Sequence, residues 1–202
     1  MKGISEIIAV VLVIAIAIAL VSIAYTWGLP LIEKRKGETI AGRVHTYFNP
    51  SNAASLQRKI TEVSGVSGTN IFSLDADGIW TINATENSIQ FMFFSKTTKV
   101  APLDDWIPAF GYTTACRPEN GTIGIDMPYI TCARAKSLGN GYEISYKVWF
   151  RALLEPHSTK GQMIKLVPEG PSSSTGKYVR ISRGSVQQAG DLTLIEVKIN
   201  LG

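Results

Sequence analysis

Reactive side chains are scarce in this chain of 202 residues, which contains two cysteines and two histidines. A structural zinc site needs four ligands, and the two cysteines have only His45 and His157 as further candidates. The sequence has neither a G-x-S-x-G nucleophile motif nor a phosphate-binding glycine loop. We therefore predict no enzyme activity and no metal or cofactor site, and we expect both histidines to be solvated.

A basic stripe with interleaved aromatic residues is also missing, although the formal net charge is +4. Such a stripe is the signature of nucleic-acid binding, so no nucleic-acid partner is predicted. Asp75-Ala76-Asp77-Gly78 is similar to part of a calcium loop, but it lacks the third aspartate and the distal bidentate glutamate. We expect a plain turn there.

The chain does contain one long uncharged run, from Ile7 to Trp27. It holds about 21 residues, and about 20 apolar residues cross a bilayer core as a helix. A secretory signal peptide would have a shorter apolar region followed by a small-residue cleavage site. A helix that is apolar on every side is buried on every side, which requires either lipid or many copies of itself.

The end of this run carries several signals. Tyr25 and Trp27 lie where an interfacial aromatic belt is expected. Gly28 and Pro30 predict a kink or a stop, because proline lacks the N–H that would bond the carbonyl of residue 26. Residues 38–48 predict a further helical stretch, which Asn49-Pro50 ends.

The remainder of the chain predicts a β-rich head. The best strands are 88–94, 142–150 and 192–199, and the second alternates apolar and polar residues with a period of two. Weaker strands are expected at 60–64, 71–75, 78–83, 123–127, 129–133, 162–167 and 177–182. The predicted fold class is α+β: a long N-terminal hydrophobic helix followed by a mainly antiparallel, β-sandwich-like (immunoglobulin-like) head.

Cys116 and Cys132 indicate one disulfide in an oxidising compartment, with unpaired buried thiols as the alternative. Two glycosylation sequons begin at Asn83 and Asn120. Together with the apolar run, these features favour a head outside the cell. The basic segment Lys34-Arg35-Lys36 outweighs Lys2 and, by the positive-inside rule, would place the head inside.

Glu6 is the one acidic residue beside the run. A carboxylate in the first turn of a helix is favoured by the helix dipole, with Ser5 as a possible N-cap. Alternatively, a buried Glu6 requires a positive partner, such as the α-amino group of a neighbouring chain.

The segment Lys2-Gly3-Ile4-Ser5-Glu6-Ile7 and the apolar run after it resemble the N-terminus of archaeal type IV pilins and archaellins. The resemblance covers residues 1–45, and the head resembles no family. It implies that a prepilin peptidase cuts after Gly3 and leaves Ile4 as the mature N-terminus. The domains are then a leader (1–3), a hydrophobic helix with a Pro30 kink and linker (4–48), and an extracellular head (49–202).

The resemblance further implies that assembly machinery extracts the helix from the membrane and bundles it with copies into an extracellular filament. We expect adhesion or surface attachment as its role, with motility or DNA uptake as specialised alternatives. The implied polymerisation helix includes Glu6, Ile7, Val11, Ile14, Ile18, Val21, Tyr25, Trp27 and Pro30. Bacterial pilins carry their glutamate at the fifth mature position, whereas Glu6 would be the third. The alternative function is a monomeric, membrane-anchored β domain that binds a ligand outside the cell.

Overall fold

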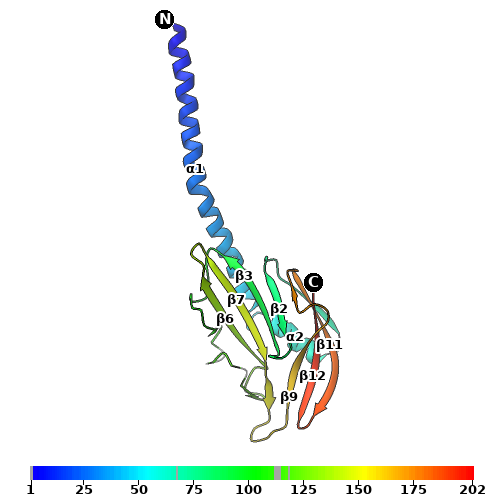
Figure 1. Ribbon diagram of the computed structural model, residues 1–202. Helices are drawn as coiled ribbons and strands as arrows, with labels where there is room; N and C mark the ends of the chain where they lie inside the picture. The colour runs from blue at the N-terminus through cyan, green and yellow to red at the C-terminus, as the bar shows by residue number, and fades with distance from the viewer. Residues whose placement is uncertain (1, 67, 112–114, 118) are drawn as a thin grey trace.

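A computed structural model of the chain describes residues 2–66, 68–111, 115–117 and 119–202, with helix side chains from Ile7 onward. Its first element is α1 (Lys2–Tyr47), which projects from the head as a long rod (Figure 1). Pro30 lies inside this helix, so of the predicted kink or stop at Gly28 and Pro30 the stop is wrong, and the kink stays a prediction. Proline removes one backbone hydrogen bond, and the apolar helix on one side and head packing on the other maintain the helix across that gap.

The C-terminal part of α1 packs into the head. Gly37, Ala41, Val44 and Phe48 are buried, and their spacing of three or four residues places them on one face of the helix. The helix ends at Tyr47, just before Asn49-Pro50. This confirms the predicted helical stretch over 38–48.

A short second helix, α2 (Leu56–Gly65), follows α1. The strand predicted at 60–64 is therefore wrong. Leu56, Ile60 and Val63 are buried, and they repeat at intervals of four and three residues, which is a helical period. Ten residues hold too few turns for this period to stand out from a short apolar run in the sequence.

Within the described residues, six strands form each of two sheets. Sheet A contains, in spatial order, β1 (Thr69–Ser73), β11 (Tyr178–Ala189), β12 (Leu192–Leu201), β9 (Gly161–Pro168), β8 (Ala152–Leu154) and β5 (Gly121–Thr122). Sheet B contains β10 (Ser173–Ser174), β2 (Ile79–Asn83), β3 (Ser88–Ser95), β7 (Tyr142–Phe150), β6 (Tyr129–Ser137) and β4 (Ile107–Pro108). Most pairs are antiparallel; β12 with β9 and β5 with β8 are parallel. The predicted α+β fold class is confirmed.

The three strongest predicted strands correspond to β3, β7 and β12. The strand predicted at 123–127 is wrong, because β5 ends at Thr122 and a turn follows. Gly124 has a φ of +81°, and the side chain of Asp126 accepts a hydrogen bond from the backbone N–H of Thr122. Both features impose a turn on a segment whose apolar residues suggest a strand.

Both sheets, α2 and the end of α1 share one hydrophobic core. Phe48, directly after α1, stacks on Trp80 of β2 and on Tyr146 of β7, with ring centroids 6.1 and 5.0 Å apart. Trp80 also contacts Phe91 of β3, at 4.6 Å. The helix is thus anchored by an aromatic cluster, and its orientation relative to sheet B is set by that packing.

Asn87, in the turn between β2 and β3, joins the two sheets. Its side-chain amide N–H groups donate to the carbonyls of Phe150 in sheet B and Ile164 in sheet A, at 2.9 and 2.6 Å. Its Oδ1 accepts the backbone N–H of Leu166, at 2.8 Å. The residue is buried and has a φ of +51°, a conformation that asparagine tolerates better than most residues.

Candidate functional site

The N-terminal half of α1 presents an extended apolar surface that the rest of the chain leaves exposed. An 18-residue window of this helix has a mean hydropathy of 3.3, and none of that window is buried inside the protein. By length and composition the helix is compatible with membrane insertion. The described members of the predicted polymerisation set are all exposed: Ile7, Val11, Ile14, Ile18, Val21, Tyr25, Trp27 and Pro30.

Besides the phenolic Tyr25, two hydroxyl side chains lie within this apolar surface, and both bond back to the helix. Ser22 Oγ donates to the carbonyl of Ile18 at 2.8 Å, and Thr26 Oγ1 donates to that of Ser22 at 2.9 Å. Back-bonding of this kind hides a polar group within the helix itself. The surface from Ile7 to Trp27 therefore presents almost only apolar atoms to whatever covers it.

The predicted processing residues Lys2, Gly3 and Ile4, and also Glu6, have side chains outside the described part of the structure. Their backbone belongs to α1. The predictions of cleavage after Gly3 and of a partner for Glu6 stay predictions.

The helix and the head meet closely at Gly37. Ser95 Oγ, at the end of β3, donates to the carbonyl of Gly37 at 3.1 Å. A Cβ at Gly37 would lie 3.0 Å from that Oγ and 3.2 Å from the backbone nitrogen of Lys96, which is tighter than almost all real contacts. Lys96 also forms an ion pair, at 3.9 Å, with Glu33, which lies one helical turn before Gly37 in α1. Sequence reasoning missed this junction because its two sides are 58 residues apart and form no local motif.

A second attachment involves the Asp75–Gly78 loop. Asp75 pairs with Arg43 of α1 at 3.0 Å and with Lys177 at 3.1 Å, and Asp77 also pairs with Lys177. Hydrogen bonding to Lys177 first, and then to Arg43, lowers the pKa of Asp75. These carboxylates thus serve as ion-pair partners in the loop between β1 and β2. No group of three potential metal ligands occurs among the described residues.

His45 is half-buried at the same junction, so the prediction of a solvated side chain is wrong. Its Nδ1 lies 2.9 Å from the hydroxyl of Tyr146, and its ring centroid lies 4.7 Å from that of Phe110. Burial, and then the charge of Lys99, lower the pKa of His45, while burial raises the pKa of Tyr146. Neutral His45 thus fits between α1 and the head.

We expect the attachment of α1 to weaken in acid because of His45. The unfolded chain, with a histidine pKa of 6.5, takes up a proton before the folded chain does. Stability is therefore fully present above pH 6.5 and falls as the pH drops below that value. Urea titrations at about pH 7.5 and about pH 5, which lie on either side of that pKa, measure the free energy of unfolding. Between the two pH values this free energy should fall more in the wild type than in His45→Gln. Equal losses in both proteins would contradict the assignment.

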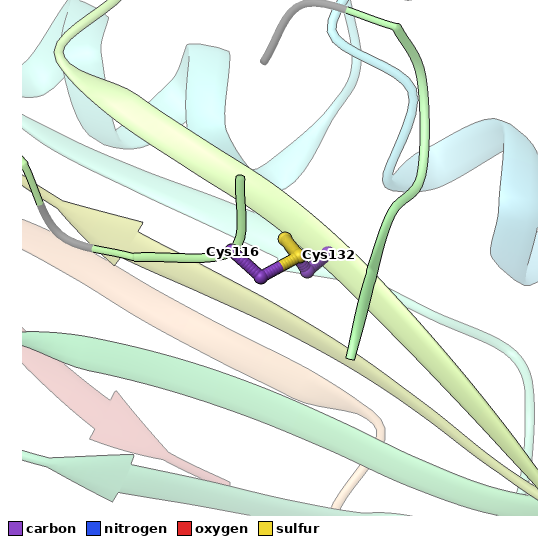
Figure 2. Close-up of a disulfide and its surroundings, with 2 residues drawn as sticks. All are labelled: Cys116 and Cys132. Atoms are coloured by element: carbon purple, nitrogen blue, oxygen red, sulfur yellow. A yellow bond between two sulfur atoms is a disulfide. The ribbon is translucent and has the colours of Figure 1, made fainter. Parts of the chain in front are cut away.

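Cys116 and Cys132 form a disulfide (Figure 2), as predicted. Cys132 is fully buried in β6 beside Ile130 and Trp149, and Trp106 packs against the same cluster. Arg134 lies over the Trp106 ring and Lys147 over the Trp149 ring, at 5.0 and 4.5 Å. The bond ties the segment before β5 to the outer face of sheet B.

Reducing this disulfide should destabilise the head. The cysteines are 16 residues apart, and closing a loop of that size contributes about 3 kcal/mol in the chain-entropy description. We expect the Cys116→Ser/Cys132→Ser variant, and reduced wild type, to lose about that much unfolding free energy. Urea titrations with and without reductant measure it. A wild type unaffected by complete reduction would show that the bond is not a stabilising link.

The two sequons lie at turns. Asn83 ends β2 and is half-buried, with its Oδ1 accepting the N–H groups of Thr85 and Glu86. Asn120 is exposed and immediately precedes β5. Glycosylation of both stays a prediction, and Asn120 is the more accessible acceptor.

Comparison of the chain with protein-family models, curated proteins and solved structures found no match. What bears on function is therefore the physical character of α1, its close junction with the head and the order of residues at the N-terminus.

Proposed function

We propose that this chain is a structural subunit of a helical, pilus-like filament at the cell surface, which polymerises through α1. The observation that carries the proposal is the exposed apolar surface of α1, uncovered from Ile7 to Ile32 and joined to a folded head at Gly37. Soluble monomers rarely expose apolar patches of more than a few hundred Å². This surface therefore requires a partner along its whole length.

Packing of copies against one another meets that requirement. Each buried Val, Leu or Ile side chain contributes roughly 1.5–3 kcal/mol, so burying even half of the large side chains of α1 gives a strong driving force. Alanines spread among the larger residues allow close backbone approach between helices. Because one helix contacts several neighbours through different faces, the contacts are heterologous and build an open helical assembly.

Lipid covers the same surface before assembly, and the anchored monomer remains the alternative function. Processing distinguishes the two. The proposal requires cleavage after Gly3, so protein from native membranes should begin at Ile4 by intact mass. A protein that retains Met1 would contradict the proposal.

The cleavage site can be tested directly. Gly3→Val should block processing and leave the chain in the membrane fraction, whereas Lys2→Arg, which keeps the positive charge, should be processed normally. Normal processing of both variants would show that the resemblance at the N-terminus is misleading. The proposed role of the filament is attachment to surfaces, with the head exposed along its outside.

A further inference from the structure

The apolar part of α1 ends in a collar of positive charge. Exposed apolar side chains extend to Ile32, and Lys34, Arg35 and Lys36 follow, all exposed. Successive residues of an α-helix are 100° apart, so these three cations cover more than half of the helix circumference. No ion pair joins them to another side chain of the described residues.

The head adds a fourth cation at the same level. Lys96 follows β3 and lies beside α1, since it pairs with Glu33 at 3.9 Å and adjoins the Ser95–Gly37 hydrogen bond. Glu33 is matched by Lys96, and the exposed Glu38 offsets one of the three helix cations, so a net excess of two positive charges remains at this level. The end of the head through which α1 enters is therefore electropositive.

Two exposed apolar side chains lie at that same end of the head. Phe94, near the end of β3, is 49% exposed, and Leu138, in the β6–β7 turn, is 46% exposed. A Cβ at Gly141 would come 2.5 Å from Phe94 Cζ, so the phenyl ring lies against the backbone of this turn. The Leu138 N–H donates to the carbonyl of Gly141 at 2.9 Å, which fixes the turn.

These features share one edge of the molecule. β3 and β6 end, and β7 begins, beside the point where α1 enters the head (Figure 1). We call this edge the rim: Lys34, Arg35, Lys36 and Lys96 with Phe94 and Leu138. Cations mixed with a few protruding apolar side chains are what an anionic bilayer surface attracts, by charge and by shallow insertion.

We propose that the rim binds the surface of an anionic bilayer while α1 spans it. The apolar side chains from Ile7 to Ile32 occupy about 39 Å of helix, enough to cross a hydrocarbon core of about 30 Å with some tilt. Lys34 lies about 3 Å further along the helix, at the headgroup phosphates. The inference rests on the membrane-inserted stage of the proposed function, and it applies equally to an anchored monomer.

The lipid surface thereby orients the head as well as the helix. A flexible tether would leave the head free to tumble, whereas α1 is fixed to the head by the Gly37 junction. The anchored chain presents its rim to the membrane and the opposite end of the head away from it. Release of the rim from anionic lipid then becomes part of extraction into a filament.

Hydrogen exchange of the full-length chain in nanodiscs tests the rim. The discs contain phosphatidylcholine alone or an equimolar mixture with phosphatidylglycerol, and the peptides read are 93–97 and 137–142. We expect slower exchange in the anionic discs at low salt, and loss of the difference in high salt. Each cation close to an anionic surface shifts the membrane-binding equilibrium about fivefold. The K34Q/R35Q/K36Q/K96Q variant should therefore show almost no difference in exchange between the two kinds of disc.

A matched variant, K160Q/K165Q/R180Q/K198Q, removes four exposed charges on or beside sheet A and should behave as the wild type. Equal exchange in the two kinds of disc would overturn the proposal, as would an equal effect of both variants.

Slower exchange on adding inorganic phosphate to phosphatidylcholine discs would reassign the rim to phosphate binding. Slowing confined to filaments would reassign it to a neighbouring copy. The comparison of low and high salt uses the wild type alone, so it remains valid even if a variant fails to fold. The exchange experiment uses single chains in nanodiscs, so failure of the filament proposal would leave its result unchanged.

Discussion

Replacing Ile18 with glutamate should abolish filaments while leaving a folded, membrane-inserted subunit. Ile18 lies midway along the exposed apolar part of α1 and is 62% exposed in the single chain. A charge at the centre of a spanning helix costs about 2.5–3.5 kcal/mol of insertion free energy. The fourteen other Ile, Leu and Val residues between Ile7 and Ile32, at roughly 0.3–0.6 kcal/mol each, outweigh that cost. Inside a bundle of copies, however, every subunit would bury an unpaired carboxylate. Packing of the neighbouring apolar side chains cannot compensate the desolvation cost of that charge.

The measurement is the amount of head recovered in sheared cell-surface material compared with the membrane fraction. We expect at least a tenfold shift toward the membrane, since 1.4 kcal/mol already corresponds to about tenfold. Ile18→Val removes one methylene group and serves as the control, with near-normal assembly. Filaments of Ile18→Glu in normal yield would show that this surface is not buried on assembly.

Asn87→Ala should cause a large loss of stability in the head. It removes three side-chain hydrogen bonds, one to sheet B and two to sheet A, and leaves the carbonyls of Phe150 and Ile164 without their side-chain donor. Each unsatisfied buried polar group costs about 1–3 kcal/mol, so a total loss of about 3–5 kcal/mol is expected. That is a large part of the 5–15 kcal/mol typical of a domain. Urea unfolding of the full chain in detergent, followed by tryptophan fluorescence, measures it.

Two further variants separate the contributions at this position. Asn87→Gly relieves the positive φ but loses the same hydrogen bonds, so it should be nearly as unstable as Asn87→Ala. Asn83→Ala removes a side chain that also accepts two backbone N–H groups, but in a half-buried turn, and should cost only about 1 kcal/mol. Similar losses for Asn83→Ala and Asn87→Ala would contradict the bridging role of Asn87.

The features that could be predicted from the sequence are those encoded by local repetition. The apolar run from Ile7 and the alternation in β7 are long, so their periods stand out from chance. In β7, Ile144, Tyr146 and Val148 are buried on one face as expected. The helix at Leu56–Gly65 and the turn after Thr122 were predicted wrongly because a short apolar run fits a strand and a helix equally well.

The junction and the sheet bridge could not be predicted for a different reason. His45 and Asn87 appear in the sequence as isolated polar residues near turn signals, and their partners Tyr146 and Ile164 are 101 and 77 residues away. Only tertiary packing brings these groups together. Pro30 is a third case: its local preference is to end a helix, but α1 continues because the apolar helix before it and the packing against the head after it maintain the helix across the missing hydrogen bond.

Electron microscopy of sheared cell-surface material, labelled with an antibody against the head, tests the filament assignment most directly. The account predicts filaments labelled along their whole length, with a reconstruction showing α1 helices bundled at the centre and heads outside. Head antigen found only in membranes, with no labelled filament in the sheared material, would contradict it.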